Sequence, residues 1–410
     1  MSQNAGCHVV VTGLGVVAGE SCGAERLADT LRGSIMPCSD VDRRAGYHVP
    51  ESARLAVLSG GVNLAQWVSP AMGRRMSAPS KLAVAAARMA VADAELLEAM
   101  AGPRTAVVMS NALGAADFTE RLLRTAILEG PAAVSPFSFT ESVANAAAAQ
   151  IAIDTQARGP SLTIVQREAG ILTAVGRGAA EVAAGRADRA LVGGVEEMPP
   201  LAHAVFDRLL SLARPGSVGG EVARPFDRRR SGFVLAEGAV VLVLEEEDRA
   251  RLRGASIRAR IRGFGSAYDT SAPRLGWGRG DAPLAHALGR VLDRAGLAPR
   301  DVGRIVSGAS GSVAGDRLEA RTLRGAWQGN PLPPILAPKG VTGQYGGGFL
   351  ASAVLAMSDQ EFGATGGFCE PDPELGVIPH GGGSLPPAGI TLVTSLASGG
   401  AASWLLLEGI

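Results

Sequence analysis

The chain has 410 residues, of which 47% are apolar and 19% are charged, so it can bury a large core. Its 39 basic and 39 acidic side chains cancel. A general binder of nucleic acid or anionic membranes needs a cationic field, which argues against both partners. No apolar run reaches the roughly 18–20 residues of a membrane span, and the first residues lack the pattern of a secretory signal. We therefore expect a cytoplasmic protein.

The cysteines and histidines show no metal-ligand spacing. The cysteines are Cys7, Cys22, Cys38 and Cys369, and the histidines are His8, His48, His203, His286 and His380. No CxxC pair occurs among them, and the histidines are scattered along the chain. Ordinary reduced thiols are the simplest interpretation, and we expect neither a metal nor a cofactor.

Hydrophobic patterning predicts strands that alternate with helices. In the first part of the chain the predicted strands are 9–11, 105–109, 161–165, 189–192 and 239–245, and the predicted helices are 80–100, 142–153 and 169–184. In the second part the predicted strands are 257–263, 304–307, 389–395 and 402–407, and the predicted helices are 283–295, 315–323 and 349–357. This alternation indicates βαβ units around a largely buried sheet.

Two features narrow the fold class. Both parts open on a similar strand, VVVTGLG at 9–15 and RIRGFG at 260–265, which predicts a duplicated domain with halves 1–250 and 251–410. Several predicted helices consist largely of Ala and Gly, and small side chains allow helices to pack closely. We therefore predict an α/β protein with a thiolase-like, five-layer αβαβα fold built from two duplicated halves.

Six segments in this order resemble the β-ketoacyl-ACP synthase family. They are VVVTGLG at 9–15, RGPSLTI at 158–164, ALVGGVEE at 190–197, RPFDRRRSGFVLAEGAVVLVLEEE at 224–247, GDRLEA at 315–320 and PKGVTG at 338–343. Each segment alone is a weak signal. Their order and spacing along almost the whole chain make the resemblance specific.

Active members of this family use a cysteine nucleophile and two histidines. A helix N-terminus lowers the pKa of the thiol, and the imidazoles stabilise the enolate that forms as carbon dioxide leaves. Aligning the flanking motifs puts Glu168 at the nucleophile position, Gly308 at the first histidine position and Gln344 at the second. The glycine loop that carries a gating phenylalanine in active members has Ser398 instead. The resemblance therefore implies a scaffold without its catalytic residues.

One branch of the family matches these replacements. The chain resembles the chain length factors of type II polyketide synthases, the β subunits of their ketosynthases, in loop 110–112, Gly308 and the glycine run 346–348. It departs from them in having Glu168, where glutamine is common. The resemblance implies a non-catalytic subunit that forms a heterodimer, or a higher assembly, with an active ketosynthase. It would shape the tunnel for a polyketide chain borne by an acyl carrier protein, and so set chain length.

Two other functions stay open. Glu168 is an acid, base or acyl acceptor if the chain is a malonyl-ACP decarboxylase or an acyltransferase of altered chemistry. An ordinary condensing enzyme would need another cysteine at a strand-to-helix elbow, and no cysteine of the chain is placed there. A carboxylate is also favoured at a helix N-terminus without any catalytic role.

Further residues receive roles from the resemblance. Lys339, one of only two lysines, is expected to form a structural ion network with Asp316 and Glu319, or to neutralise Glu168. The candidate tunnel residues are Ala112, Ala115, Ala116, Phe118, Phe137, Phe139, Gly194 and Met198. Small side chains among them leave room for an acyl chain, although alanine also suits a packed interface. The basic run Arg228–Arg230 is interpreted as solvated surface, with docking of an acidic carrier protein as the alternative.

Overall fold

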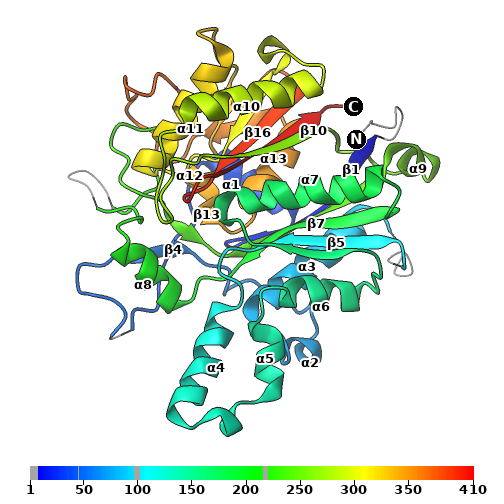
Figure 1. Ribbon diagram of the computed structural model, residues 1–410, viewed down its shortest axis with the longest axis vertical. Coiled ribbons are helices and arrows are strands. Elements are labelled where there is room, and N and C mark those ends of the chain that lie inside the picture. The colour runs from blue at the N-terminus through cyan, green and yellow to red at the C-terminus, as the bar shows by residue number, and fades with distance from the viewer. Residues whose placement is uncertain (1–7, 45, 97–101, 216–219) are drawn as a thin grey trace.

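The computed structural model describes residues 8–44, 46–96, 102–215 and 220–410, and its main sheet has two halves (Figure 1). The first half has the order β6 (Ser161–Ile164), β5 (Thr105–Ser110), β7 (Arg189–Glu196), β9 (Gly238–Glu246) and β1 (Val9–Ala18). The second half has the order β12 (Ile335–Leu336), β11 (Arg304–Ser307), β16 (Ile390–Leu396), β17 (Ala401–Glu408) and β10 (Ala259–Tyr268). The short strand β2 (Ser21–Cys22) pairs with β1 beside this path.

The two halves have the same topology. When the strands of each half are numbered along the chain, they lie side by side in the order third, second, fourth, fifth, first. The third, second and fourth strands are parallel to one another, and the other neighbouring pairs are antiparallel. Strands β1 and β10 join the halves through an antiparallel pairing of Val9 with Ile261 and Val11 with Ala259. This repetition confirms the predicted duplication, while the division at residue 250 stays a prediction.

Six helices complete the layers. Helices α7 (Gly170–Ala183) and α13 (Gly348–Ser358) form the central layer and pack with residues from both halves of the sheet. Helices α3 (Ala78–Asp93) and α6 (Ala146–Asp154) cover the outer face of the first half. Helices α10 (Asp281–Arg294) and α11 (Val313–Trp327) cover the outer face of the second half. The predicted five-layer αβαβα fold is therefore confirmed.

Both faces of the sheet are buried. Along β9, Val240 and Leu242 face the central helices, whereas Val241 and Val243 face the outer layer of α3 and α6. Side chains of a strand alternate between its faces, so a strand covered on both sides is apolar throughout. This explains why β9 is a continuous run of Val and Leu.

Small residues set the spacing between helices and sheet. A Cβ atom added to Gly15 of β1 would lie 1.9 Å from the carbonyl oxygen of Ala86 in α3. A Cβ atom on Gly176 of α7 would lie 2.3 Å from the ring of Phe264 in β10. The layers are thus in contact at positions where only glycine fits, as the Ala- and Gly-rich helices predict.

Two predicted helices differ from the structure. The helix predicted over 142–153 begins later, because α6 starts at Ala146. Ser142 is instead the last residue of α5 (Pro136–Ser142), and Val143 after it has an extended backbone. The helix predicted over 80–100 begins earlier, with Ser77 as its N-cap, and α3 ends at Asp93. Residues 97–101 of that prediction lie outside the described residues. Patterning also did not predict α1 (Ala24–Gly33), α4 (Ala116–Leu128), α8 (Pro200–Arg208) or α9 (Glu247–Leu252).

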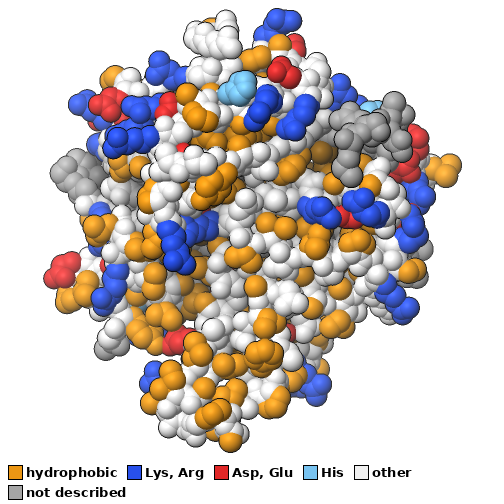
Figure 2. All heavy atoms as spheres, viewed as in Figure 1, with side chains coloured by type: hydrophobic (Ala, Val, Ile, Leu, Met, Phe, Trp, Pro, Cys, Tyr) orange, Lys and Arg blue, Asp and Glu red, His pale blue; other side chains and the backbone are white. Residues whose placement is uncertain are grey.

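Helices α4 and α5 form an arm that projects from the layered body, and we call residues 116–142 the helical arm (Figure 1). Its surface carries apolar side chains, as Figure 2 shows at the bottom of the molecule. Ile127 is 78% exposed and Leu128 is 68% exposed. Exposed apolar groups gathered in one region indicate an interaction surface.

A small sheet lies beside the central layer. Its order is β13 (Gln344–Tyr345), β8 (Leu235–Ala236), β4 (Leu55–Val57) and β3 (Ser39–Asp40), and a separate hairpin pairs β14 (Glu361–Ala364) with β15 (Gly381–Ser384). Parallel pairing with β8 fixes the position of Gln344 and Tyr345. No helix in the described ranges is long and apolar enough to cross a lipid bilayer.

Candidate functional site

Glu168 lies in the elbow between β6 and α7. A single 3-10 turn, Arg167–Ala169, connects the strand to the helix. Arg167 has a φ of 47°, in the left-handed region that residues with a side chain rarely adopt. This backbone turns the chain sharply, and the side chain of Glu168 enters the interior, where it is only 7% exposed. The elbow is the place that the alignment assigns to the nucleophile.

The Glu168 cavity is small. Its volume is about 30 Å³, close to that of a single water molecule. The polar side chains that line it belong to Ser110, Arg167, Glu168, Glu196, Lys339 and Tyr345. Gly194 and Phe349 are among its apolar walls.

Burial dominates the electrostatics of Glu168. Desolvation raises the pKa of its carboxyl group, and this effect exceeds the lowering by Lys339, Arg167 and the neighbouring phenol of Tyr345. One carboxyl oxygen, Oε2, has no hydrogen-bond partner in the part of the chain that the structure describes. The group is therefore poorly prepared to carry a negative charge, and a nucleophile needs that charge.

Gly308 lies directly beside the elbow and has no room for a side chain. A Cβ atom there would lie 2.7 Å from the carbonyl oxygen of Thr394 and 3.0 Å from Cα of Ser395. Ser395 in turn donates a hydrogen bond of 2.7 Å from Oγ to the carbonyl oxygen of Glu168. The backbone N–H of Gly308 donates to Glu319 at 3.1 Å. The first histidine position is thus closed by backbone packing.

Gln344, which the alignment assigns to the second histidine position, lies on β13. Its side chain is only 2% exposed, and its Oε1 has no hydrogen-bond partner among the described residues. A carboxamide neither takes up nor releases a proton near neutral pH. Neither histidine position can therefore supply an imidazole.

Ser398 lies at the turn between β16 and β17 and contacts the elbow. Arg167 Nη1 donates to both the carbonyl oxygen and Oγ of Ser398, each at 2.9 Å. Ala397 and Ala401, at the base of this turn, pack against Ala169. The predicted gate position is therefore in contact with the residue that precedes Glu168.

Lys339 is buried at the start of α12 (Lys339–Thr342). Its Nζ lies 4.9 Å from the ring centroid of Phe349. Burial lowers the pKa of the ammonium group, and attraction to Glu168, Glu319 and Asp316 opposes that change. No carboxylate oxygen of the described residues lies within the 4.0 Å of an ion pair with Lys339. The electrostatic interaction is present, and the predicted ion network stays a prediction.

Asp316 and Glu319 are bound mainly by donors other than Lys339. Asp316 accepts the backbone N–H of Phe226 at 2.9 Å and that of Ser310 at 3.1 Å. Glu319 accepts the hydroxyl of Ser307 at 2.5 Å. Desolvation raises the pKa of Asp316 to about 6 and that of Glu319 to about 7. These carboxyl groups anchor loops around the site.

Glu196 is a second buried carboxyl group in the Glu168 cavity, and the sequence analysis did not single it out. It accepts the backbone N–H groups of Ala112 and Leu113, the latter at 3.1 Å. Desolvation raises its pKa to about 8. Burial raises the pKa of Tyr345, and the nearby carboxyl groups of Glu168 and Glu196 raise it further. The sequence signal that could have identified Glu196 is the pair of adjacent acids, Glu196 and Glu197, at the end of a buried strand.

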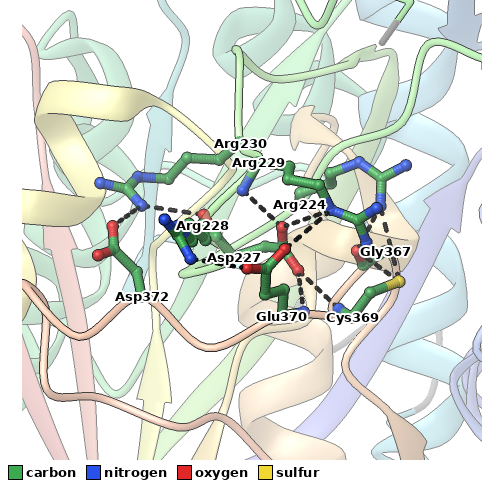
Figure 3. Close-up of polar contacts among 9 residues, drawn as sticks. All are labelled: Arg224, Asp227, Arg228, Arg229, Arg230, Gly367, Cys369, Glu370 and Asp372. Atoms are coloured by element: carbon green, nitrogen blue, oxygen red, sulfur yellow. Dashed lines mark hydrogen bonds and ion pairs between the residues drawn. The ribbon is translucent and has the colours of Figure 1, made fainter. Parts of the chain in front are cut away.

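A polar network joins the basic run to the loop over 367–372 (Figure 3). Asp227 accepts the backbone N–H groups of Cys369 and Glu370, each at 2.6 Å. Arg230 is buried and forms an ion pair with Asp372 at 2.6 Å. The interpretation of Arg228–Arg230 as solvated surface is therefore wrong for Arg230, because this side chain is buried and forms an ion pair with Asp372.

Two family descriptions match the chain. "Beta-ketoacyl synthase, N-terminal domain" matches residues 7–250, and "Beta-ketoacyl synthase, C-terminal domain" matches residues 258–366. The chain belongs to the beta-ketoacyl synthase family. This membership agrees with the resemblance found in the sequence and with the elbow geometry of the site.

Individual relatives fit this family. The putative polyketide beta-ketoacyl synthase 2 of Streptomyces halstedii is 33% identical over 356 residues, which cover 86% of this chain and 83% of the relative. A solved structure described as "The ishigamide ketosynthase/chain length factor" superposes with a TM-score of 0.88 at 27% identity, over 98% of this chain and 99% of that chain. A beta-ketoacyl synthase from Burkholderia phymatum has a TM-score of 0.88 at 24% identity, over 98% and 100%.

Within this beta-ketoacyl synthase scaffold, the candidate tunnel residues do not share one cavity. Gly194 lines the Glu168 cavity, and Phe118 lines a separate cavity of about 80 Å³ inside the helical arm. Met198 is buried in another cluster, and Phe137 is 48% exposed. Ala115 is buried, whereas Ala112 and Ala116 are half-buried at the start of α4. Their role in a tunnel stays a prediction.

Proposed function

We propose that this beta-ketoacyl synthase homologue is a non-catalytic chain length factor of a type II polyketide synthase. One observation supports the proposal above the others: the elbow holds a desolvated carboxyl group, Glu168, where condensation requires a thiolate. The free cysteines of the described chain are Cys22, Cys38 and Cys369, and none of them lines the Glu168 cavity.

The rest of the site supports the same proposal. Decarboxylation of a malonyl unit needs donors that stabilise the enolate oxygen. Gly308 has no room for a side chain, its N–H already donates to Glu319, and Gln344 is not an imidazole. The small cavity beside Glu168, about 30 Å³, is in keeping with this proposal.

The surface supports association with an active ketosynthase. Strand β6 is the last strand of its half and pairs only with β5 in the described structure, so its outer edge is free. Val165, directly after this strand, is 60% exposed, and Ile153 at the end of α6 is 70% exposed. Together with the exposed apolar side chains of the helical arm, they offer apolar contacts for a related subunit. We propose that the site of the partner ketosynthase holds the polyketide chain that an acyl carrier protein bears.

Co-expression with a ketosynthase that has the cysteine and both histidines tests the proposal. We expect a heterodimer by size-exclusion chromatography and native mass spectrometry, and polyketide formation from malonyl-ACP only when both subunits are present. Removing the partner's cysteine should abolish the product, whereas Glu168→Ala should leave turnover within a few-fold. A stable homodimer with no affinity for any ketosynthase would contradict the proposal.

The raised pKa of Glu168 keeps one other function open, since a protonated carboxyl group can act as a general acid. A malonyl-ACP decarboxylase or an acyltransferase would convert malonyl-ACP without a partner. Incubating the chain alone with malonyl-ACP separates the two proposals. Acetyl-ACP that disappears in Glu168→Gln would favour this alternative, and we expect none.

A further inference from the structure

A large cleft lies on the outer side of the second half of the sheet. Its volume is about 780 Å³, and its walls are α11, the start of α10, the loop over 329–335 and the segment 376–378. Helices α10 and α11 lie at the top of the molecule in Figure 1, whereas the helical arm lies at the bottom. The cleft therefore stays free when the arm binds a ketosynthase.

Two arginines in this cleft have no carboxylate partner. Arg321 and Arg324 both line it, and they are three positions apart on α11, so they lie on the same side of the helix. Neither forms an ion pair within 4.0 Å in the part of the chain that the structure describes. Asp281 is the acid that lines the same cleft. The cleft thus has an excess of positive charge, on a chain whose formal net charge is zero.

The opposite wall is shaped around Arg324 and is partly apolar. Arg324 Nη1 donates to the carbonyl oxygen of Leu375 at 3.3 Å. A Cβ atom on Gly376, which has a φ of 60°, would lie 3.0 Å from the same nitrogen. Ile378, 69% exposed, and the prolines of the loop over 329–335 lie beside it. Arginine next to exposed apolar groups is typical of surfaces that bind another protein.

The basic run over 228–230 does not offer its charge in this way. Arg228 forms an ion pair with Glu370 at 3.0 Å, and Arg230 forms one with Asp372 at 2.6 Å (Figure 3). These arginines are already neutralised by acids of the same chain. An acidic partner therefore gains more from the unpaired arginines of the cleft.

We propose that this cleft docks an acidic helix of the acyl carrier protein. The inference rests on the proposed function, in which a carrier protein bears the polyketide chain. Carboxylates of the helix pair with the guanidinium groups of Arg321 and Arg324, and an apolar side chain packs against the wall at Ile378. Docking here holds the carrier protein on the heterodimer without blocking the arm. Because the contacts are exposed ion pairs, binding weakens as the ionic strength rises.

A photo-crosslinker in the cleft tests the docking site in the assembled heterodimer. With Ile378→p-benzoylphenylalanine, we expect a light-dependent cross-link to the acyl carrier protein, whereas the same group at Leu252, which is 91% exposed on α9, should give none. Arg321→Glu should lower the yield at least fivefold, and so should high salt. Arg321 forms no hydrogen bond or ion pair in the described chain, so this change should not disturb the fold.

Arg290→Glu is the matched control, because Arg290 is an exposed arginine of α10 that does not line the cleft. In the same heterodimers, Arg321→Glu should raise KM for malonyl-ACP several-fold with kcat unchanged, and Arg290→Glu should change neither. Absence of the cross-link at 378, or equal yields in the two charge-reversal variants, would overturn the docking site.

The docking site and the proposed function fail in different ways. Native mass spectrometry shows whether the heterodimer forms before any light is applied. If no heterodimer forms, the proposed function fails and the docking site fails with it. If the heterodimer forms and makes polyketide without the cross-link at 378, only the docking site is wrong.

Discussion

Ser395 Oγ donates a hydrogen bond of 2.7 Å to the backbone carbonyl oxygen of Glu168, which is 227 positions earlier in the chain. The same Ser395 has its Cα 3.0 Å from the point where a side chain of residue 308 would begin. The elbow, the strand β16 and the first histidine position are therefore packed against one another. Ser395 thus connects Glu168 with Gly308.

Gly308→Ala should destabilise the chain. The new Cβ would lie 2.7 Å from the carbonyl oxygen of Thr394, and overpacking of this kind costs about 1–3 kcal/mol. Gly289→Ala is the matched control, because this helical glycine of α10 has open space around its Cβ position and should gain about 0.5–1 kcal/mol. Thermal melting of both variants checks the prediction, and equal melting temperatures would contradict it.

The same packing predicts that catalysis cannot be restored by simple replacement. A Glu168→Cys, Gly308→His, Gln344→His variant should form no condensation product from malonyl-ACP, since a histidine at 308 displaces the backbone of β16. An assay for product by mass spectrometry measures this, with an active ketosynthase as the positive control. Product from the triple variant alone would show that the first position can open.

Stability should fall as the pH rises from about 6 to 8. The pKa of Glu196 is about 8 in the folded chain against an ordinary value of 4.5. Between these values the unfolded chain has released the proton and the folded chain retains it, so this group alone lowers the free energy of unfolding by about 1.4 kcal/mol per pH unit. Glu196→Gln should flatten this slope in urea unfolding, whereas Glu361→Gln, at an exposed position, should not.

Lys339→Met should be more harmful at high pH. Removing the ammonium group leaves Glu168 and Glu319 without its attraction, so their carboxyl groups hold protons still more tightly. At pH 8.5 the loss of stability should exceed the loss at pH 6, because more of the buried carboxyl groups must then carry a charge. Lys81→Met, at the only other lysine, should show no such pH dependence in the same unfolding measurements.

Ile127→Asp should weaken the heterodimer. Ile127 is 78% exposed on the helical arm, so the change should leave the stability of the separate chain nearly unaffected. Burial of a charge in an apolar interface should raise the dissociation constant at least tenfold by calorimetry or titrated pull-down. Leu252→Asp, at a residue 91% exposed on α9, is the control. Equal binding of both variants would exclude the arm from the interface.

Much of the fold could be predicted because its signals are local. Strand β11 has the predicted bounds, and β5 differs from its prediction only by Ser110. Each of these strands is a short apolar run between turn residues. Helix α5 was not predicted, and the start of α6 was predicted too early, because Val143 is compatible with a helix and only its surroundings give it an extended backbone. Helix α4 has no fully buried residue, so its pattern was also weak.

The functional site also has residues that the sequence predicted and residues that it did not. Motif spacing was sufficient to place Glu168 at the elbow and to bring Gly308 beside it, because the flanking motifs share their framework with the family. Arg167, Ser395, Glu196 and Tyr345 were not found. Each acts through contacts with residues far away in the chain, as Arg167 does with Ser398, and composition and spacing do not encode such contacts.

By itself, the sequence determined the family scaffold, the duplicated layers and the absence of a cysteine and two histidines from their aligned positions. These depend on residue identity and on local periodicity, which can be read along the chain. Only the tertiary structure decided that Gly308 has no space for a side chain, that Lys339 has no ion pair within 4.0 Å among the described residues, and that Arg167 donates to Ser398. Those features depend on interatomic distances and desolvation, which exist only once distant segments are packed together.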